Sequence, residues 1–327
     1  MMHRRNLMRT AGGLLVDDVF STDLFTANGS NQTITSGIDL AGYGGLVWEK
    51  LRSTAGNHWL VDTDRGANKV LRSDTTGAET DNPAFPGGFT STGHSSGTHV
   101  SGQSVVARTY RKSPRFFDVV TYTGNGVAGR TIPHNLGVTP GMMIVKRRSS
   151  TGTWLTYHRD TSASPGEDYM AMNSTQAAAK FSGIWNNTEP TETDFTVGNF
   201  QEVNSSGSTY VAYLFAHDPE PDGIIRGGVY TGNRKAATGP TVTLGWEPQF
   251  LLMKSITSTE DWVMVDNMRS PSNPRNKWLY PNLSEGEYVD SDGVSFSPTG
   301  FQVTSTNPKV NDNSTDYLYM AIRAEGA

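Results

Sequence analysis

The sequence predicts an all-β protein of three tandem antiparallel β-sandwich repeats, jelly-roll-like in kind, behind a short extended N-terminal arm. Three observations lead to this fold class: an internal repeat, a composition rich in turn-forming residues, and no sustained 3.6-residue periodicity. A length of 327 residues suits two to three domains, and repeats of about 100 residues match a common domain size. The predicted ranges are 1–18 for the arm and 19–114, 115–222 and 223–327 for the repeats.

The internal repeat combines an aromatic strand, a turn containing Gly or Asn, and an apolar strand that ends in lysine. In the second repeat it reads FFDVVTYTGNGVAGRTIPHNLGVTPGMMIVK over residues 116–146. Gly and Asn tolerate a positive φ angle, so they separate one strand from the next. The aromatic residue and the lysine are separated by 25, 24 and 24 residues in the pairs Phe25–Lys50, Tyr122–Lys146 and Tyr230–Lys254. Near-equal spacing in three places predicts three copies of one structural unit.

The strands expected in each repeat are short, and Gly, Pro, Ser and Asn lie between them. They cover residues 46–50, 58–61, 68–72, 88–90 and 103–111 in the first repeat, 116–122, 142–146, 154–157, 169–173, 194–197 and 210–216 in the second, and 249–254, 262–265, 277–280, 300–303 and 317–322 in the third. The closing runs 210–215 and 317–322 are apolar on both faces. We therefore expect them to be central strands buried on two sides, or to meet another subunit on one face.

The composition excludes several classes of function. Charged residues make up 18% of the chain and the net charge is −5, which disfavours a nucleic-acid partner. The chain has no cysteine, so disulfides and thiolate metal sites are excluded. Its apolar runs fall well short of the ~20 residues of a membrane span, so no membrane insertion is expected. No Gly-rich phosphate loop precedes a helix and the histidines are scattered, so no cofactor or metal is expected.

Two sets of residues recur in the repeats. Lys50, Lys146 and Lys254 each end an apolar strand, and we expect their stems to lie on the sheet and their ammonium groups to reach water. Trp59, Trp154 and Trp262 follow these lysines by nine, eight and eight residues. A tryptophan that recurs at one hairpin position is expected in the core, and a sugar-stacking platform is the alternative.

Candidate sites outside the repeat pattern are fewer. Aromatic residues that do not recur lie near turns, and these are the candidate glycan contacts: Tyr43, Trp185, Trp246 and Tyr288. Asp62 and Asp64 have the residue type of a glycosidase carboxylate pair. The second repeat has Tyr157 and His158 in the matching places, so polar residues that differ between scaffold repeats are the simpler interpretation. No catalytic residue is assigned, and the protein is not expected to be an enzyme.

Several strings of residues carry a resemblance to a known family. They are GIDLA at 37–41, GGLVW at 44–48, DRG at 64–66, LRSDTTGA at 71–78, FDVVTYTGNG at 117–126, YVAYLFAH at 210–217 and DNMR at 266–269. In these strings the chain resembles the tail-fibre-like virion structural proteins of tailed bacteriophages, many from marine hosts, over nearly its whole length from Val19 onward. Glu49 departs from the pattern, since an apolar residue is expected in that strand. An edge-facing or interface position would accommodate it.

The resemblance implies a virion structural protein, most simply a tail fibre or adhesin component that presents β-modules for attachment to the host surface. A capsid decoration, head-fibre or neck protein is an alternative, and a glycan-binding module or depolymerase is a second one. The implied location is the virion, assembled in the host cytoplasm. The implied partners are other virion proteins, copies of the chain itself in a homotrimer, and a host cell-surface glycan. Arg4, Arg5 and Arg9 of the arm are the candidate virion-docking residues.

Overall fold

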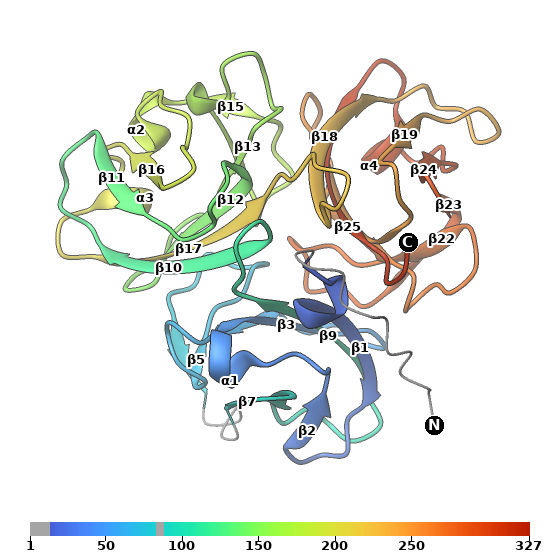
Figure 1. Ribbon diagram of the computed structural model, residues 1–327, viewed down its shortest axis with the longest axis horizontal. Helices are drawn as coiled ribbons and strands as arrows, with labels where there is room; N and C mark the ends of the chain where they lie inside the picture. Colours follow the sequence, from blue (N-terminus) through green and yellow to red (C-terminus); the bar gives the residue numbers. More distant parts are fainter. Residues whose placement is uncertain (1–13, 83–87) are drawn as a thin grey trace.

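One order of strands occurs three times in the structure, a computed structural model that describes residues 14–82 and 88–327. In each copy the first strand pairs with the last, the last with a third, and the third with a fourth, and all of these pairs are antiparallel. Figure 1 shows the copies as three lobes around a common centre. We call residues 14–114, 115–222 and 223–327 units 1, 2 and 3. The predicted all-β fold with antiparallel sheets is confirmed.

Unit 1 begins with the single turn η1 (Val16–Asp18). Its main sheet contains, in spatial order, β1 (Phe20–Thr26), β9 (Ser104–Arg111), β3 (Gly45–Leu51) and β4 (Trp59–Asp62). The other strands are β2 (Gln32–Thr35), β8 (Gly93–Ser96) and β7 (Phe89–Thr90) in a second sheet, and the pair β5 (Lys69–Val70) and β6 (Thr80–Asp81). Helix α1 (Leu40–Tyr43) starts after Asp39, whose carboxylate accepts a hydrogen bond from the N–H of Gly42 and so caps the helix.

Unit 2 has the longest main sheet. In spatial order it contains β10 (Phe117–Thr123), β17 (Thr209–Ala216), β12 (Pro140–Arg147), β13 (Leu155–His158), β14 (Asp168–Ala171) and β15 (Ala179–Lys180). The second sheet pairs β11 (Arg130–Pro133) with β16 (Asp194–Val197). Three single turns complete the unit: η2 (Pro165–Glu167), α2 (Ser182–Trp185) and α3 (Gln201–Asn204).

Unit 3 contains two four-stranded sheets. The main sheet has the order β18 (Ile225–Thr231), β25 (Asp316–Arg323), β20 (Pro248–Ser255) and β21 (Val263–Asp266). The second sheet has the order β19 (Thr241–Thr243), β24 (Gly300–Val303), β23 (Tyr288–Ser297) and β22 (Arg275–Trp278), and α4 (Pro308–Asn311) is a single turn.

The glycine of the repeated Thr-Gly-Asn turn is required by a close approach of two backbone segments. A Cβ atom on Gly124 would lie 2.2 Å from the carbonyl oxygen of Ser205, and one on Gly232 would lie 2.2 Å from that of Asp312. These distances are far below van der Waals contact, so no side chain fits at either position. The neighbouring Gly126 does adopt the positive φ angle, 75°, that the sequence predicted for this turn.

Both faces of each main sheet are buried, because successive side chains of a strand point to opposite faces. In β20, Leu251 and Met253 face the second sheet of unit 3 and belong to one cluster with Trp278. Phe250 and Leu252 point the other way, into a cluster shared with units 1 and 2. Each unit is therefore a two-layer sandwich whose main sheet also forms part of a common core.

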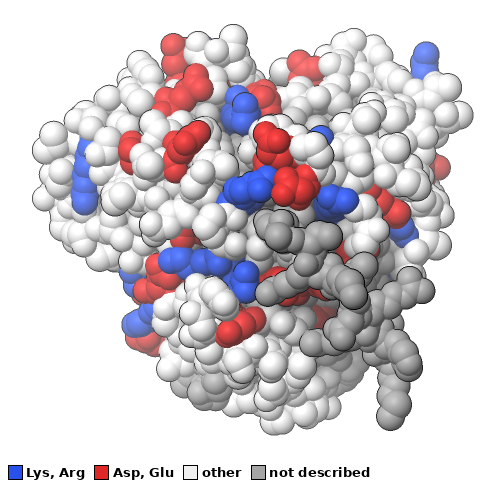
Figure 2. Space-filling view, viewed as in Figure 1, with Lys and Arg blue, Asp and Glu red and all other residues white. Residues whose placement is uncertain are grey.

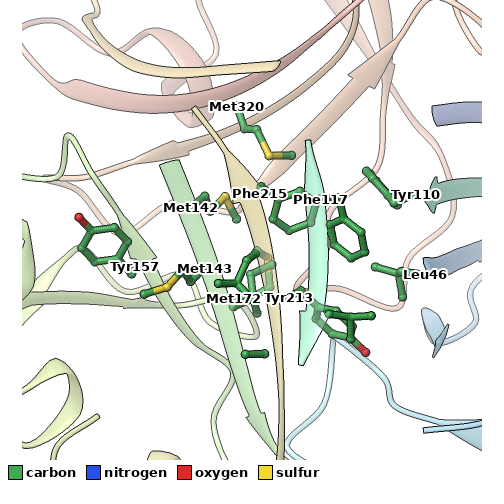
Figure 3. Packing of buried hydrophobic residues seen from close by; sticks show 14 of the residues in the cluster. Leu46, Tyr110, Phe117, Met142, Met143, Tyr157, Met172, Tyr213, Phe215 and Met320 are labelled. Carbon is green, nitrogen blue, oxygen red and sulfur yellow. The ribbon is translucent and has the colours of Figure 1, made fainter. Parts of the chain in front are cut away.

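The shared core lies where the three main sheets meet. Figure 3 shows Leu46 and Tyr110 of unit 1 close to Phe117 and Phe215 of unit 2, with Met320 of unit 3 beside them. The closing strands β17 and β25 each lie between two neighbours and are buried on both faces, as predicted. The expectation that each repeat buries a core of its own is too simple, since the largest apolar cluster runs through all three units.

The predicted boundary of the N-terminal arm is too far along the chain. Val16 in η1 is buried and belongs to the shared core together with Val19. Residues 16–18 are thus part of unit 1, because an apolar side chain at this point completes the core. Arg4, Arg5 and Arg9 lie outside the described residues, and their docking role stays a prediction.

Candidate functional site

The three units contact one another through matched residues that occupy the same register in each main sheet. Lys50, Lys146 and Lys254 mark this register, because each lies opposite an equivalent residue of the closing strand. Counting from these lysines identifies equivalent positions in the other strands. The contacts are cyclic: each kind of contact runs in one direction around the three units, so that every unit is the donor to one neighbour and the acceptor from the other in that kind of contact.

The three lysines are buried at these junctions, with exposures of 1%, 0% and 0%, and they do not reach water. Each ammonium group donates to a backbone carbonyl of the neighbouring unit: Lys50 to Ser284 at 3.0 Å, Lys146 to Thr76 at 3.2 Å and Lys254 to Thr175 at 3.3 Å. The prediction of solvated ammonium groups is wrong because carbonyls of the neighbouring unit, joined in units 1 and 3 by carbonyls of the lysine's own hairpin, take the place of water. Burial lowers the pKa of all three lysines to about 8.

These lysines make the stability of the fold depend on alkaline pH. In the unfolded chain a lysine has a pKa of about 10.4, so between about pH 8 and 10 the unfolded state binds more protons than the folded state. We therefore expect the free energy of unfolding to rise from pH 7.5 to 9.5, by on the order of 1 kcal/mol per lysine. Urea denaturation at the two pH values measures the rise.

A matched pair of variants assigns this rise to the junctions. Lys146→Met is expected to show a smaller increase than the wild-type protein, whereas Lys235→Met, at an exposed lysine, should show the full increase. An unchanged increase in Lys146→Met would contradict the assignment.

Each junction also contains a ring nitrogen that donates to the neighbouring unit. Nε1 of Trp154 donates to the carbonyl of Arg72 at 3.0 Å, and Nε1 of Trp262 donates to that of Ala171 at 3.0 Å. Both indoles are fully buried, so the predicted core position of these two tryptophans is confirmed. Their N–H groups add a directional contact between units.

In unit 1 the equivalent residue is His58, and not Trp59. Nε2 of His58 lies 2.9 Å from the carbonyl oxygen of Tyr280. Because Nδ1 accepts a hydrogen bond from the indole of Trp48 at 2.8 Å, Nε2 carries the proton and donates it to the carbonyl. Burial and the nearby charge of Lys50 lower the pKa of His58 well below its usual range, so the ring is neutral. A neutral histidine thus replaces the donor that tryptophan supplies elsewhere.

A third matched contact joins backbone to backbone. The N–H of Glu79 donates to the carbonyl of Arg148 at 2.9 Å, and the N–H of Glu287 donates to that of Arg52 at 2.7 Å. The same residues form two-pronged ion pairs through their side chains. At the remaining junction, the N–H of Ala178 donates to the carbonyl of Ile256 at 2.8 Å, so an apolar pair replaces the ion pair.

Carboxylates complete two of the junctions near the centre. Asp62 of unit 1 is fully buried, pairs with Arg65 at 2.5 Å and accepts a hydrogen bond from the hydroxyl of Tyr213 of unit 2 at 2.8 Å. Asp64 lies at the surface against Lys112, 3.2 Å away. Asp62 and Asp64 are therefore engaged in separate ion pairs, and the structure does not place them as a glycosidase pair facing a substrate.

The equivalent carboxylate in unit 3 is Asp266. It accepts hydrogen bonds from Arg269 at 2.7 Å and from Arg108 of unit 1 at 2.8 Å. Burial alone would raise the pKa of Asp266, but the two guanidinium groups outweigh it and hold the pKa at about 2. In unit 2 the same position is His158, whose Nε2 lies 3.1 Å from the carbonyl oxygen of Tyr319.

Glu49 forms a separate polar cluster inside the sandwich of unit 1. It is fully buried, and its carboxylate lies 3.2 Å from Nε2 of His94 and 3.1 Å from Nε2 of His99. Burial would raise the pKa of Glu49, but the hydrogen bonds from the two imidazoles lower it below its usual value. Val145 and Met253 hold the equivalent positions. The expectation of an edge or interface position is therefore wrong, because Glu49 finds its partners within its own unit.

Replacing Glu49 by glutamine is expected to lower the free energy of unfolding by about 1–3 kcal/mol at pH 7, since the charge-assisted hydrogen bonds of two buried imidazoles are weakened. Chemical denaturation measures the loss, and Glu189→Gln at an exposed position is the control. Unfolding of Glu49→Gln at the wild-type urea concentration would show that the cluster does not stabilise unit 1.

The four candidate glycan residues separate into two groups. Trp185 and Trp246 are 1% and 2% exposed, so neither can present a ring face to a sugar, and this prediction is wrong for both. Tyr43 and Tyr288 are 60% and 43% exposed. Tyr43 stacks under the guanidinium of Arg111, 4.2 Å from its ring centre, and Tyr288 packs beside Trp278 and Tyr280, each 6.0 Å away between ring centres. The structure does not bring the four residues together.

We also searched the structure for metal sites and for membrane-spanning helices. Among residues 14–82 and 88–327, no group of three or more acidic, histidine or cysteine side chains is arranged to hold a metal ion. In the same part of the chain, the helices are too short and too polar to cross a bilayer.

Comparison with known proteins identifies the family of the chain. No curated protein matches the chain. Among solved structures, the one described as "Crystal Structure of the STIV MCP" is similar at 7% identity and a TM-score of 0.18, over 63% of this chain and 95% of that chain, and a likeness of this size carries no argument. A family model described as a domain of unknown function (DUF7483) matches residues 16–114 and 90–326, which together span all three units. The chain therefore belongs to the DUF7483 family.

Proposed function

We propose that the protein is a non-catalytic structural component of a bacteriophage virion, in the first place a tail fibre or adhesin component. The observation that carries the proposal is the cyclic set of junctions, in which buried lysines and ring N–H groups join three sandwiches into one body. Buried hydrogen bonds of this kind fix the relative positions of the units. A rigid body is what a particle component needs in order to present its loops. The resemblance of the sequence strings to tail-fibre-like proteins supplies the class.

The charges on the surface support partners other than nucleic acid. In Figure 2, Lys and Arg side chains lie beside Asp and Glu side chains near the place where the lobes meet, and large parts of the outer lobes carry neither. Arg115, for example, pairs with Asp218 and Asp222 at 2.8 Å each. A surface of paired charges produces no field of one sign that would attract a polyanion. Other virion proteins and neutral host molecules remain as the partners in this proposal.

A capsid decoration protein is the second candidate, and the threefold arrangement of the lobes favours it. A chain with three similar sheets around one centre matches the symmetry of a threefold position on a capsid lattice. The same arrangement offers an alternative to the predicted homotrimer. One chain already contains three copies of the sheet, so a single chain could take the place of three. Light scattering on the purified protein decides between a monomer and a homotrimer.

The test is made on particles of the virus that encodes the protein. We expect the chain in purified particles, and we expect particles from a deletion strain to be intact but to adsorb poorly to the host. Particles that adsorb normally but lose their genome on heating would favour the decoration role. Absence of the chain from purified wild-type particles would overturn both.

A further inference from the structure

A small cavity lies on unit 2, beside the turn that joins β15 to α2. It is shallow and open to solvent, has a volume of about 420 Å³, and is lined by Glu167, Lys180, Phe181, Ser182 and Asn187. The Phe181 side chain is 44% exposed, so one face of its ring is open to a ligand. The lining thus combines one aromatic ring with a carboxylate, an ammonium, a hydroxyl and an amide.

The ring of Phe181 is held in place from two sides. It meets the ring of Phe200 edge to face, at 5.1 Å between centres and 87° between planes. It also lies over Gly183, where a Cβ atom would come within 2.7 Å of the ring. The missing side chain of Gly183 therefore leaves the space that the ring occupies. A ring fixed by its neighbours loses little entropy when a ligand stacks on it.

The backbone under the cavity is fixed as well. Trp185, at the end of α2, is buried and donates its indole N–H to the carbonyl of Asp168 in β14 at 2.9 Å. The N–H of Phe181 donates to the carbonyl of Glu167 at 3.0 Å. Trp185 is thus an anchor of the cavity wall and not a contact residue.

The polar groups of the cavity are balanced in charge. Nζ of Lys180 lies 2.6 Å from a carboxylate oxygen of Glu167, and both side chains are largely open to solvent. An anionic ligand would have to compete with Glu167 for this ammonium and would leave the carboxylate unpaired. Ser182 and Asn187, both exposed, add uncharged donors and acceptors. The site therefore favours a neutral ligand that carries many hydroxyl groups.

We infer that this cavity binds a neutral pyranose of a glycan, with the apolar face of the sugar on Phe181 and its hydroxyl groups on Glu167, Lys180 and Asn187. An aromatic ring offers a flat apolar surface, and charged or amide groups around it hydrogen-bond hydroxyl groups at the edge of a sugar. The inference rests on the proposed attachment role for its biological setting, and it gives that role a site and a ligand class. Binding itself is a property of the purified protein.

The experiment titrates the purified full-length protein with neutral oligosaccharides of glucose, galactose, mannose and N-acetylglucosamine, and with glucuronate-containing oligosaccharides as acidic counterparts. Calorimetry or ligand-observed NMR reports binding. We expect at least one neutral oligosaccharide to bind, and Phe181→Ala to weaken its binding at least tenfold. Asn187→Gly removes the amide and keeps the positive φ angle of 52° accessible, so it should weaken binding without disturbing the fold. The melting temperature of each variant checks that it is folded.

The matched control is Tyr288→Ala, which removes an equally exposed ring from unit 3. Binding that survives Tyr288→Ala and is lost in Phe181→Ala and Asn187→Gly supports the site. Binding of acidic sugars alone, no binding of any neutral oligosaccharide at millimolar concentration, or wild-type binding by Phe181→Ala overturns it. If the purified protein binds as expected but deletion particles adsorb normally, the site stands and the attachment role fails.

Discussion

Replacing Asp266 by asparagine is expected to lower the free energy of unfolding by about 3–5 kcal/mol, the usual cost of breaking a buried ion pair by removing one partner. Asp266 is fully buried and is the shared acceptor of two guanidinium groups, those of Arg269 in its own unit and Arg108 in unit 1. Asparagine has nearly the same shape but no charge. The variant therefore leaves the buried guanidinium of Arg108 without a counter-ion, and it leaves Arg269 with Glu287 alone, 3.4 Å away.

Of the two arginines, Arg108 is destabilised more by the loss of the Asp266 charge. Its Nε and Nη1 atoms have no hydrogen-bond partner among the described residues, and its guanidinium lies 5.3 Å from the ring centre of Phe250. A cation over a ring is stabilised by about 0.5–2 kcal/mol, which is less than the cost of burying an unpaired charge. Asp266 thus supplies most of the compensation for Arg108.

Two further variants make the comparison specific. Asp312→Asn removes a carboxylate from an exposed pair with Arg234 and is expected to cost less than about 1 kcal/mol. Arg108→Met introduces the residue that unit 3 has at the equivalent position, Met320, and should recover part of the loss when it is combined with Asp266→Asn. Equal denaturation midpoints for Asp266→Asn and Asp312→Asn, or a double variant less stable than Asp266→Asn, would contradict this account.

The repeated fold was predictable because its signals are local. A strand, a turn and an apolar strand ending in lysine are contiguous in the sequence, and their spacing recurs. The same spacing also identifies His58 as the residue of unit 1 that is equivalent to Trp154 and Trp262. His58 follows Lys50 by eight residues, as Trp154 follows Lys146. Matching by residue type favoured Trp59 instead. A donor N–H on an aromatic ring was the shared property, and it is common to tryptophan and neutral histidine.

The junctions were not predictable, because their partners come from distant parts of the chain. Lys50 donates to Ser284, 234 residues away, and no pattern within one repeat indicates that acceptor. Glu49 shows the same limit within a unit, since His94 and His99 lie 45 and 50 residues beyond it. Trp185 and Trp246 stand near turns, where exposure is common, yet tertiary packing buries both.

Replacing Trp262 by alanine is expected to lower the free energy of unfolding by about 3–5 kcal/mol, the cost of deleting a fully buried large side chain. The indole lies at the junction between units 3 and 2, where Ile256 and Ala178 stand in place of an arginine–glutamate pair. Fewer polar contacts therefore remain to hold this junction when the indole is removed. Urea denaturation of the full chain measures the effect.

Trp262→Phe separates packing from the hydrogen bond. It keeps most of the apolar volume and loses the donor to Ala171, whose carbonyl still accepts a bond from Ser174 at 3.2 Å, so the cost should be nearer 0.5–1.5 kcal/mol. Trp59→Ala is the matched control, because Trp59 is partly exposed and stacks on His99 at 4.6 Å within unit 1. Equal losses for Trp59→Ala and Trp262→Ala would show that a position at the junction is not what makes Trp262 important. If the indole joins two units through its packing, we expect Trp262→Ala to lose much more free energy of unfolding than Trp59→Ala. The loss for Trp262→Phe should then lie between these two or close to that of Trp59→Ala.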